Sequence, residues 1–122
     1  MHVNGIDIIE ISRIRKAVDS WGERFLERVY TAREIEHCRG RAPELAARFA
    51  GKEAVMKALG TGKTGISSHD IEILVDQKGA PVVHLTGTAQ TRAVEIGLED
   101  FAITISHSRE YAVASVVGGK QV

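Results

Sequence analysis

Two carboxylate side chains lie where the pattern of apolar residues predicts buried surface. Asp7 stands between Ile6 and Ile8 in a run typical of a buried strand, and Glu53 falls within an apolar stripe at helical spacing. Removing a carboxylate from water is costly unless a cation or a hydrogen-bond donor accompanies it. The chain has no Cys/His cluster at zinc spacing, so two hard oxygen ligands favour a shared Mg²⁺. Such an ion usually completes its shell with water and substrate phosphates.

Simpler interpretations of both residues stay open at this point. Asp7 could cap the following helix or reach solvent at the end of its strand, and Glu53 could pair with Lys57 four residues later. An exposed pair of that kind contributes only a few tenths of a kcal/mol, roughly. Gly51 lies in the same helix, where glycine often permits close approach of another backbone or a ligand.

A histidine and a glycine-rich loop are further candidates for phosphate contacts. His107 ends an apolar strand pattern, where it could form a structural hydrogen bond, contact a phosphate or donate a proton. The loop 60–68 reads GTGKTGISS, but position 57 is Lys where a P-loop needs Gly, and the loop follows a helix rather than a strand. A P-loop is therefore excluded, while its backbone N–H groups could still bind another phosphate.

The elements that position these residues follow from periodicity, turns and capping residues. Thr31 and Glu34 match a capping box, and Pro43 and Gly60 suit the first turn and the end of a long helix. The predicted strands are 3–9, 70–75, 81–85, 101–107 and 111–117, and the predicted helices are 13–20 (after the cap Ser12), 31–38, 43–59 and 88–96. Helices come mainly first and hairpins later, which predicts an α+β domain with a largely antiparallel sheet.

Length and composition exclude several classes of protein. The 122 residues, 43% hydrophobic and 26% charged, fit one globular domain spanning 1–122. Sixteen basic and sixteen acidic residues argue against a nucleic-acid binder. No apolar run approaches the roughly 18 residues of a membrane span, and the charged N-terminal segment is unlike a secretory signal. The single Cys38 cannot form an intrachain disulfide, so we expect a reducing, cytoplasmic setting.

Four segments of the chain resemble the holo-[acyl-carrier-protein] synthases of the 4′-phosphopantetheinyl transferase superfamily. They are GIDIIEISRI (5–14), ARFAGKEAVMKALGTG (47–62), HDIEIL (69–74) and ISHSREYAVASVV (105–117). Their order and spacing match the family over essentially the whole chain, and Asn4 is a departure at a strand start. The resemblance implies a 4′-phosphopantetheinyl transferase fold, with helices packed on a small largely antiparallel sheet. It also implies Mg²⁺-dependent transfer of the phosphopantetheine arm of coenzyme A to a serine of apo acyl carrier protein, with adenosine 3′,5′-bisphosphate as by-product.

The resemblance implies roles for individual residues. Asp7 and Glu53 match the family's Mg²⁺ carboxylates, and Lys57 matches the lysine near the reacting diphosphate. We expect Lys57 to stabilise or protonate the leaving oxygen, and Glu53 to help remove the serine proton unless it acts only as a metal ligand. The residues that match contacts around coenzyme A are Arg48, Lys52 and His107, with Gly60 and Gly62 in the loop 60–65.

A basic segment near the N-terminus is the candidate surface for the carrier protein. Acyl carrier proteins are acidic as a family, so a basic surface is needed although the net charge of this chain is zero. The resemblance favours Arg13, Arg24 and Arg28 as contacts, with Phe25 as an apolar neighbour. The sequence equally allows a solvated helix face of mixed charge.

The resemblance also implies an assembly. The family forms homotrimers with active sites at subunit clefts, so we expect a homotrimer whose interface uses strands 101–107 and 111–117. Two other functions stay open: transfer to a different carrier domain, and a non-enzymatic nucleotide-binding module. A module of that kind would not need Asp7, Glu53 and Lys57 together, so their joint presence argues against it.

Overall fold

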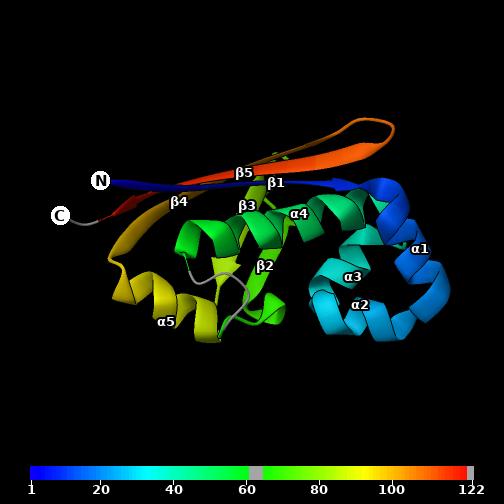
Figure 1. Ribbon diagram of the computed structural model, residues 1–122, viewed down its shortest axis with the longest axis horizontal. Coiled ribbons are helices and arrows are strands. Elements are labelled where there is room, and N and C mark those ends of the chain that lie inside the picture. Colours follow the sequence, from blue (N-terminus) through cyan, green and yellow to red (C-terminus); the bar gives the residue numbers. More distant parts are fainter. Residues whose placement is uncertain (61–64, 121–122) are drawn as a thin grey trace.

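The structure, a computed structural model, describes residues 1–60 and 65–120 (Figure 1). Within these ranges the chain forms, in order, β1 (His2–Glu10), α1 (Ile11–Trp21), α2 (Glu23–Val29), α3 (Ala32–Cys38), α4 (Ala42–Leu59), the 3₁₀ turn η1 (Ser68–Asp70), β2 (Ile71–Val75), β3 (Pro81–Leu85), α5 (Gly87–Glu95), β4 (Leu98–His107) and β5 (Tyr111–Lys120).

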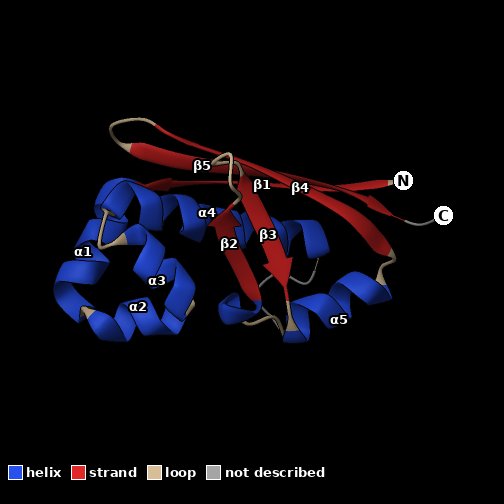
Figure 2. Ribbon diagram, turned by 180° about the vertical axis from the view of Figure 1, so that it is seen from behind, coloured by secondary structure: helices blue, strands red, loops and turns tan. Residues whose placement is uncertain are grey.

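The strands form two antiparallel sheets that meet around one helix. A three-stranded sheet has the order β1-β5-β4, and β2 pairs with β3 in a separate hairpin. The larger sheet runs along one side of α4, and the hairpin crosses another side of the same helix (Figures 1 and 2). Helices α1 to α3 gather at one end of the molecule, and the start of β1 and the end of β5 lie at the other. This confirms the predicted α+β class, with the strands divided between two sheets.

Small residues let the strands lie close to α4. Gly5 of β1 lies so close to the helix that a Cβ at this position would collide with the carbonyl oxygen of Ala54. On another side of the helix, a Cβ on Gly51 would collide with Cδ1 of Ile73 and crowd Cδ1 of Ile103. The close approach predicted at Gly51 is therefore real, but it is made by apolar side chains of β2 and β4 rather than by a backbone or a ligand.

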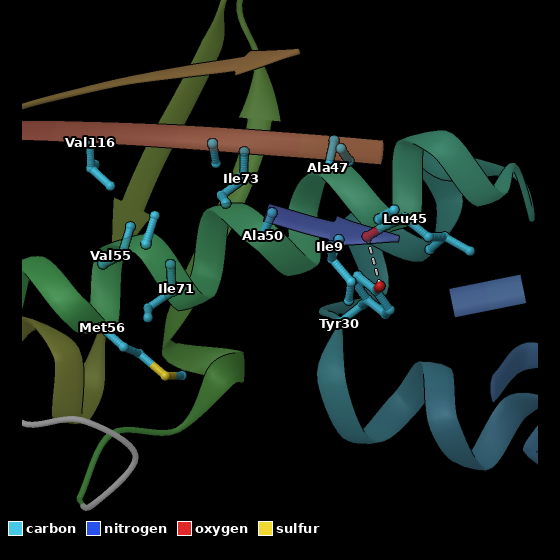
Figure 3. Close-up of a cluster of buried hydrophobic side chains, with 14 of the residues drawn as sticks. Ile9, Tyr30, Leu45, Ala47, Ala50, Val55, Met56, Ile71, Ile73 and Val116 are labelled. Atoms are coloured by element: carbon cyan, nitrogen blue, oxygen red, sulfur yellow. Dashed lines mark hydrogen bonds between the residues drawn. The ribbon is translucent and has the colours of Figure 1, made fainter. Parts of the chain in front are cut away.

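The apolar core joins both sheets to α4. Figure 3 shows Ile9 and Val116 of the larger sheet and Ile73 of the hairpin close to this helix. At its edge the hydroxyl of Tyr30 donates a hydrogen bond of 2.7 Å to the carbonyl oxygen of Leu45. Burial raises the pKa of Tyr30, so this group remains a neutral donor.

Local signals predicted most element ends correctly. Both halves of the capping box at Thr31 and Glu34 are present. Helix α4 has Pro43 in its first turn and ends at Gly60, whose φ of 76° is left-handed. No helix in residues 1–60 and 65–120 is long and apolar enough to cross a membrane.

The N-terminal helices differ from the prediction. Helix α1 begins at Ile11 without a side-chain cap, so the proposed cap at Ser12 is wrong. Helix α2 was not predicted. It follows Gly22, whose φ of 54° ends α1 and separates the two helices. Strands β4 and β5 are longer than predicted because their pairing continues to Leu98 and Lys120, through glycines that carry no β signal.

The contact of β1 with α4 predicts the effect of one added methyl group. Replacing Gly5 by Ala should lower the free energy of unfolding by about 1–3 kcal/mol or more, because the collision is with backbone. Gly119→Ala is the matched control, since its Cβ would have no neighbour closer than 3.7 Å. Urea titration of both variants measures the difference. Equal stability of the two variants would contradict this packing.

Candidate functional site

Strand β1 places Asp7 beside helix α4. Its carboxylate is 19% exposed and accepts a hydrogen bond of 3.1 Å from Nζ of Lys57. The same ammonium donates to the carbonyl oxygen of Ile6 at 2.9 Å. Because the ion pair of Lys57 is with Asp7, the alternative of a Glu53–Lys57 surface pair is wrong. The lysine remains 56% exposed, so its charge is still available to a substrate.

Glu53 lies one helical turn before Lys57, on an adjoining part of the α4 surface. It is half-buried and borders a pocket of about 480 Å³, which we call the α4 pocket. The pocket is lined by Arg28, Val29, Phe49, Lys52, Glu53, Met56, Ile66 and Ser68. Among the residues the structure describes, none forms an ion pair with Glu53. Glu53 thus borders a space that a cation or a substrate could enter.

The two carboxylates are oxygen donors of the kind that a magnesium ion takes in proteins. Asp7 of β1 pairs with Lys57, and Glu53 lies one helical turn before Lys57 on α4. Within 1–60 and 65–120 no group of three His, Cys, Asp or Glu side chains could hold a metal. This donor set suits Mg²⁺, which proteins often bind through one or two carboxylates together with phosphate oxygens and water.

Arg48 lies inside the protein. It is 1% exposed, and its Nε donates to the carbonyl oxygen of Ile73 at 3.2 Å. Its Nη1 donates to the carboxylate of Glu44 at 2.8 Å. The burial argues against the predicted contact with a coenzyme A phosphate, because the guanidinium serves to tie β2 to α4. A single arginine in a helix gives no sequence signal of this burial.

Lys52 is also internal. It is 1% exposed and forms an ion pair of 2.7 Å with the wholly buried Glu34. It donates to the carbonyl oxygen of Ser68 at 2.8 Å and to that of Ile71. Burial lowers the pKa of Lys52, and the carboxylate of Glu34 opposes this shift. Lys52, which the resemblance placed at a coenzyme A phosphate, is thus paired inside the protein with Glu34. The sequence pattern predicts Glu34 only as part of a capping box.

The structure does not bring His107 to the two carboxylates within one chain. His107 ends β4 and is exposed, and β5 separates that strand from β1. Two strand spacings are about 9.5 Å. His107 is also two residue pairs further along the ladder, opposite Ala112, whereas Asp7 lies opposite Ala114.

The glycine-rich loop is described only at its ends. Gly60 terminates α4, and Gly62 lies outside the described residues. Beyond the loop, the backbone N–H of Ser67 donates to Oγ1 of Thr88 at 3.0 Å. Thr88 in turn donates from its N–H and its hydroxyl to Asp70, at 2.8 and 2.6 Å. The bonds from Thr88 lower the pKa of the Asp70 carboxyl group. Together with the Ser67–Thr88 bond, they hold the C-terminal end of the loop against α5.

The residues proposed for carrier binding lie on α1 and α2. Arg13 and Arg24 are exposed, while Phe25 is half-buried and packs edge-on against Tyr30, with ring centroids 6.0 Å apart. Arg28 is exposed and also borders the α4 pocket. Helix α2 therefore links the basic surface to the pocket, and sequence reasoning missed this link because it missed the helix.

Comparisons with known proteins agree with this geometry. The family model of the 4′-phosphopantetheinyl transferase superfamily matches residues 4–115. A holo-[acyl-carrier-protein] synthase of Herpetosiphon aurantiacus is 46% identical over 97% of this chain and 98% of its own. One of Dehalococcoides mccartyi is 48% identical over 96% of this chain and 98% of its own.

A solved structure points to the same family as these relatives. The holo-[acyl-carrier-protein] synthase of Helicobacter pylori, in complex with coenzyme A, matches with a TM-score of 0.87 and 35% identity. The match covers 95% of this chain and 99% of that one. The carboxylates of β1 and α4 thus occur in a fold shared along nearly the whole length, and the chain belongs to the holo-[acyl-carrier-protein] synthases of the 4′-phosphopantetheinyl transferase superfamily.

Proposed function

We propose that this chain transfers the 4′-phosphopantetheine group of coenzyme A to a serine of apo acyl carrier protein. The products are holo acyl carrier protein and adenosine 3′,5′-bisphosphate. The main support is that Asp7 pairs with Lys57 where β1 meets α4, one helical turn from Glu53, which borders the α4 pocket. The activity named for the relatives and the coenzyme A bound to a solved relative agree with it. The process served would be fatty acid biosynthesis, in the cytoplasm.

The chemistry assigned to the residues follows from phosphoryl transfer. This reaction needs mainly positioning and neutralisation of charge on the transferred and leaving groups. Lys57 is oriented by its bonds to Asp7 and Ile6, yet more than half of its side chain is exposed. It would stabilise or protonate the leaving phosphate oxygen. Glu53 borders the pocket and would accept the proton of the carrier serine or orient that hydroxyl.

Asp7 and Glu53 would hold Mg²⁺. When bound, this ion would neutralise charge on the diphosphate of coenzyme A. The remaining contacts with coenzyme A would include Gly60 and the loop 60–65. With Arg48 and Lys52 buried and paired, the exposed Lys57 is the better candidate cation of α4 for the diphosphate.

We also propose a homotrimer with active sites between subunits. Ile6 and Ile8 are each 62% exposed and, with Val117, form an apolar surface on the sheet face opposite α4. An exposed apolar surface of this kind is typical of a subunit interface. His107 lies away from Asp7 and Glu53 in its own chain, so a neighbouring subunit would supply it to complete the coenzyme A site.

Removing either carboxylate should stop the reaction without unfolding the protein. Asp7→Asn and Glu53→Gln should each lower turnover by about two to three orders of magnitude, because each removes charge at the reacting diphosphate. Glu99→Gln, an exposed glutamate of β4, is the control. The measurement is the mass shift of apo acyl carrier protein incubated with coenzyme A.

Chelator should abolish the shift and Mg²⁺ should restore it. Full activity in excess chelator would exclude the metal, and labelling of only a different carrier would change the assigned substrate.

Reversing charge on α1 or α2 should weaken carrier binding. Arg13→Glu and Arg24→Glu should each raise the KM for the carrier by about tenfold or more and reduce its salt dependence, because electrostatic steering is lost. Lys78→Glu in the turn between β2 and β3 is the control, since this side chain is exposed and lies on neither helix. Steady-state kinetics at two ionic strengths measure the effect. A carrier KM that stays unchanged at low ionic strength would remove this surface from the proposal.

Sedimentation and subunit mixing test the assembly. We expect a species of three 13.3 kDa chains, so a fully active single chain would rule out an obligate trimer. Mixing Glu53→Gln chains with His107→Ala chains should restore part of the activity, because some interfaces would then combine intact residues from both. If exchange between subunits is demonstrated and activity does not return, the site is not shared by these two residues.

A further inference from the structure

Charged side chains replace a neighbouring strand at one edge of β2. In the described part of the chain β2 pairs only with β3, so backbone groups on its other edge need different partners. Lys52 donates to the carbonyl oxygen of Ile71, and Arg48 donates to that of Ile73. Glu34 accepts from the N–H of Ile73 at 2.8 Å. Two charged residues of α4 and one of α3 therefore bind the hairpin to the helices.

The pair of Glu34 and Lys52 is saturated by internal bonds. The three N–H groups of Lys52 have three acceptors, namely the Glu34 carboxylate and two carbonyl oxygens of η1 and β2. Glu34 also accepts from the N–H groups of Thr31, at 2.9 Å, and Ile73. Because both side chains are buried and fully bonded, Lys52 keeps no N–H group for a phosphate.

The same bonds set the shape of the α4 pocket. Lys52 directly precedes Glu53 in α4, and Ser68, whose carbonyl oxygen Lys52 binds, belongs to the opposite wall. The hydroxyl of Ser68 lies 3.4 Å from the carbonyl oxygen of Arg28, so that wall also meets α2. Separation of η1 from α4 would widen the pocket at Glu53.

We propose that Glu34 and Lys52 are positioning residues for the transfer reaction and do not contact coenzyme A. Their buried ion pair holds the η1 wall of the α4 pocket against the helix that presents Glu53. The inference rests on the proposed function for its kinetic test. Its structural part, the docking of η1 and β2 on α4, is tested without any reaction.

The test is a double-mutant cycle with Glu34→Gln, Lys52→Met and their combination. Each single variant should lower kcat by about 10- to 100-fold, since small displacements of reacting groups are costly. The KM for coenzyme A, and its Kd by calorimetry without metal, should change less than about threefold. The combined variant should lose little more than one single variant, because both act through one interaction. Lys78→Met, which removes an exposed cation in the turn between β2 and β3, should match the wild type.

Hydrogen exchange gives a readout that is independent of catalysis. The amide of Ile73 donates to Glu34, so it should exchange faster in both single variants and remain protected in Lys78→Met. Unchanged protection in both would overturn the docking role. If the wild type modifies no carrier, the proposed function fails, while this exchange measurement still decides whether the pair docks the hairpin.

One binding outcome and two kinetic outcomes would overturn the proposal. A Kd for coenzyme A raised tenfold or more in Lys52→Met alone, with Glu34→Gln unaffected, would make Lys52 a phosphate contact. Wild-type kcat in folded single variants would mean that the ion pair contributes only to stability and not to the reaction. If the single variants do not fold, Glu34→Leu/Lys52→Met removes both charges together and should fold. Wild-type kcat in that variant would likewise overturn the positioning role.

Discussion

The contact between β1 and α4 is the constraint on which the site depends. Gly5 brings the strand against the backbone of Ala54, and two residues later the same strand face carries Asp7. Asp7 is therefore held beside the same stretch of α4, where the ammonium of Lys57 reaches its carboxylate. A wider gap between strand and helix would separate the carboxylate from the lysine that it orients.

Helical geometry divides the charges of α4 into two groups with different uses. Arg48 and Lys52 are four residues apart and share one side of the helix, where they bind the free edge of β2. Glu53 and Lys57 are also four residues apart and share another side, which faces β1 and the pocket. The first group is buried and internally paired. The second stays accessible, so one helix supplies both the support of the site and its chemistry.

The order of strands decides what one chain can contribute. With β5 between β1 and β4, the face that supports Asp7 carries His107 two strands away. The opposite face of the sheet presents Ile6 and Ile8 to the outside. Both observations follow from one antiparallel ladder, and both agree with a site completed by a second copy of the chain.

Local chemistry let the sequence predict the α+β class, the capping box at Thr31, both ends of α4 and the face of Asp7. Those features depend on residues close in the chain, and capping, left-handed glycine and alternation act over a few residues. The resemblance added the family. Only the tertiary structure decided that Lys57 pairs with Asp7 and that Lys52 pairs with Glu34. A lysine four residues after a glutamate looks alike whether it is exposed or enclosed. What separates the two cases is the element packed against each side of the helix, and that is fixed by contacts between residues far apart in the sequence.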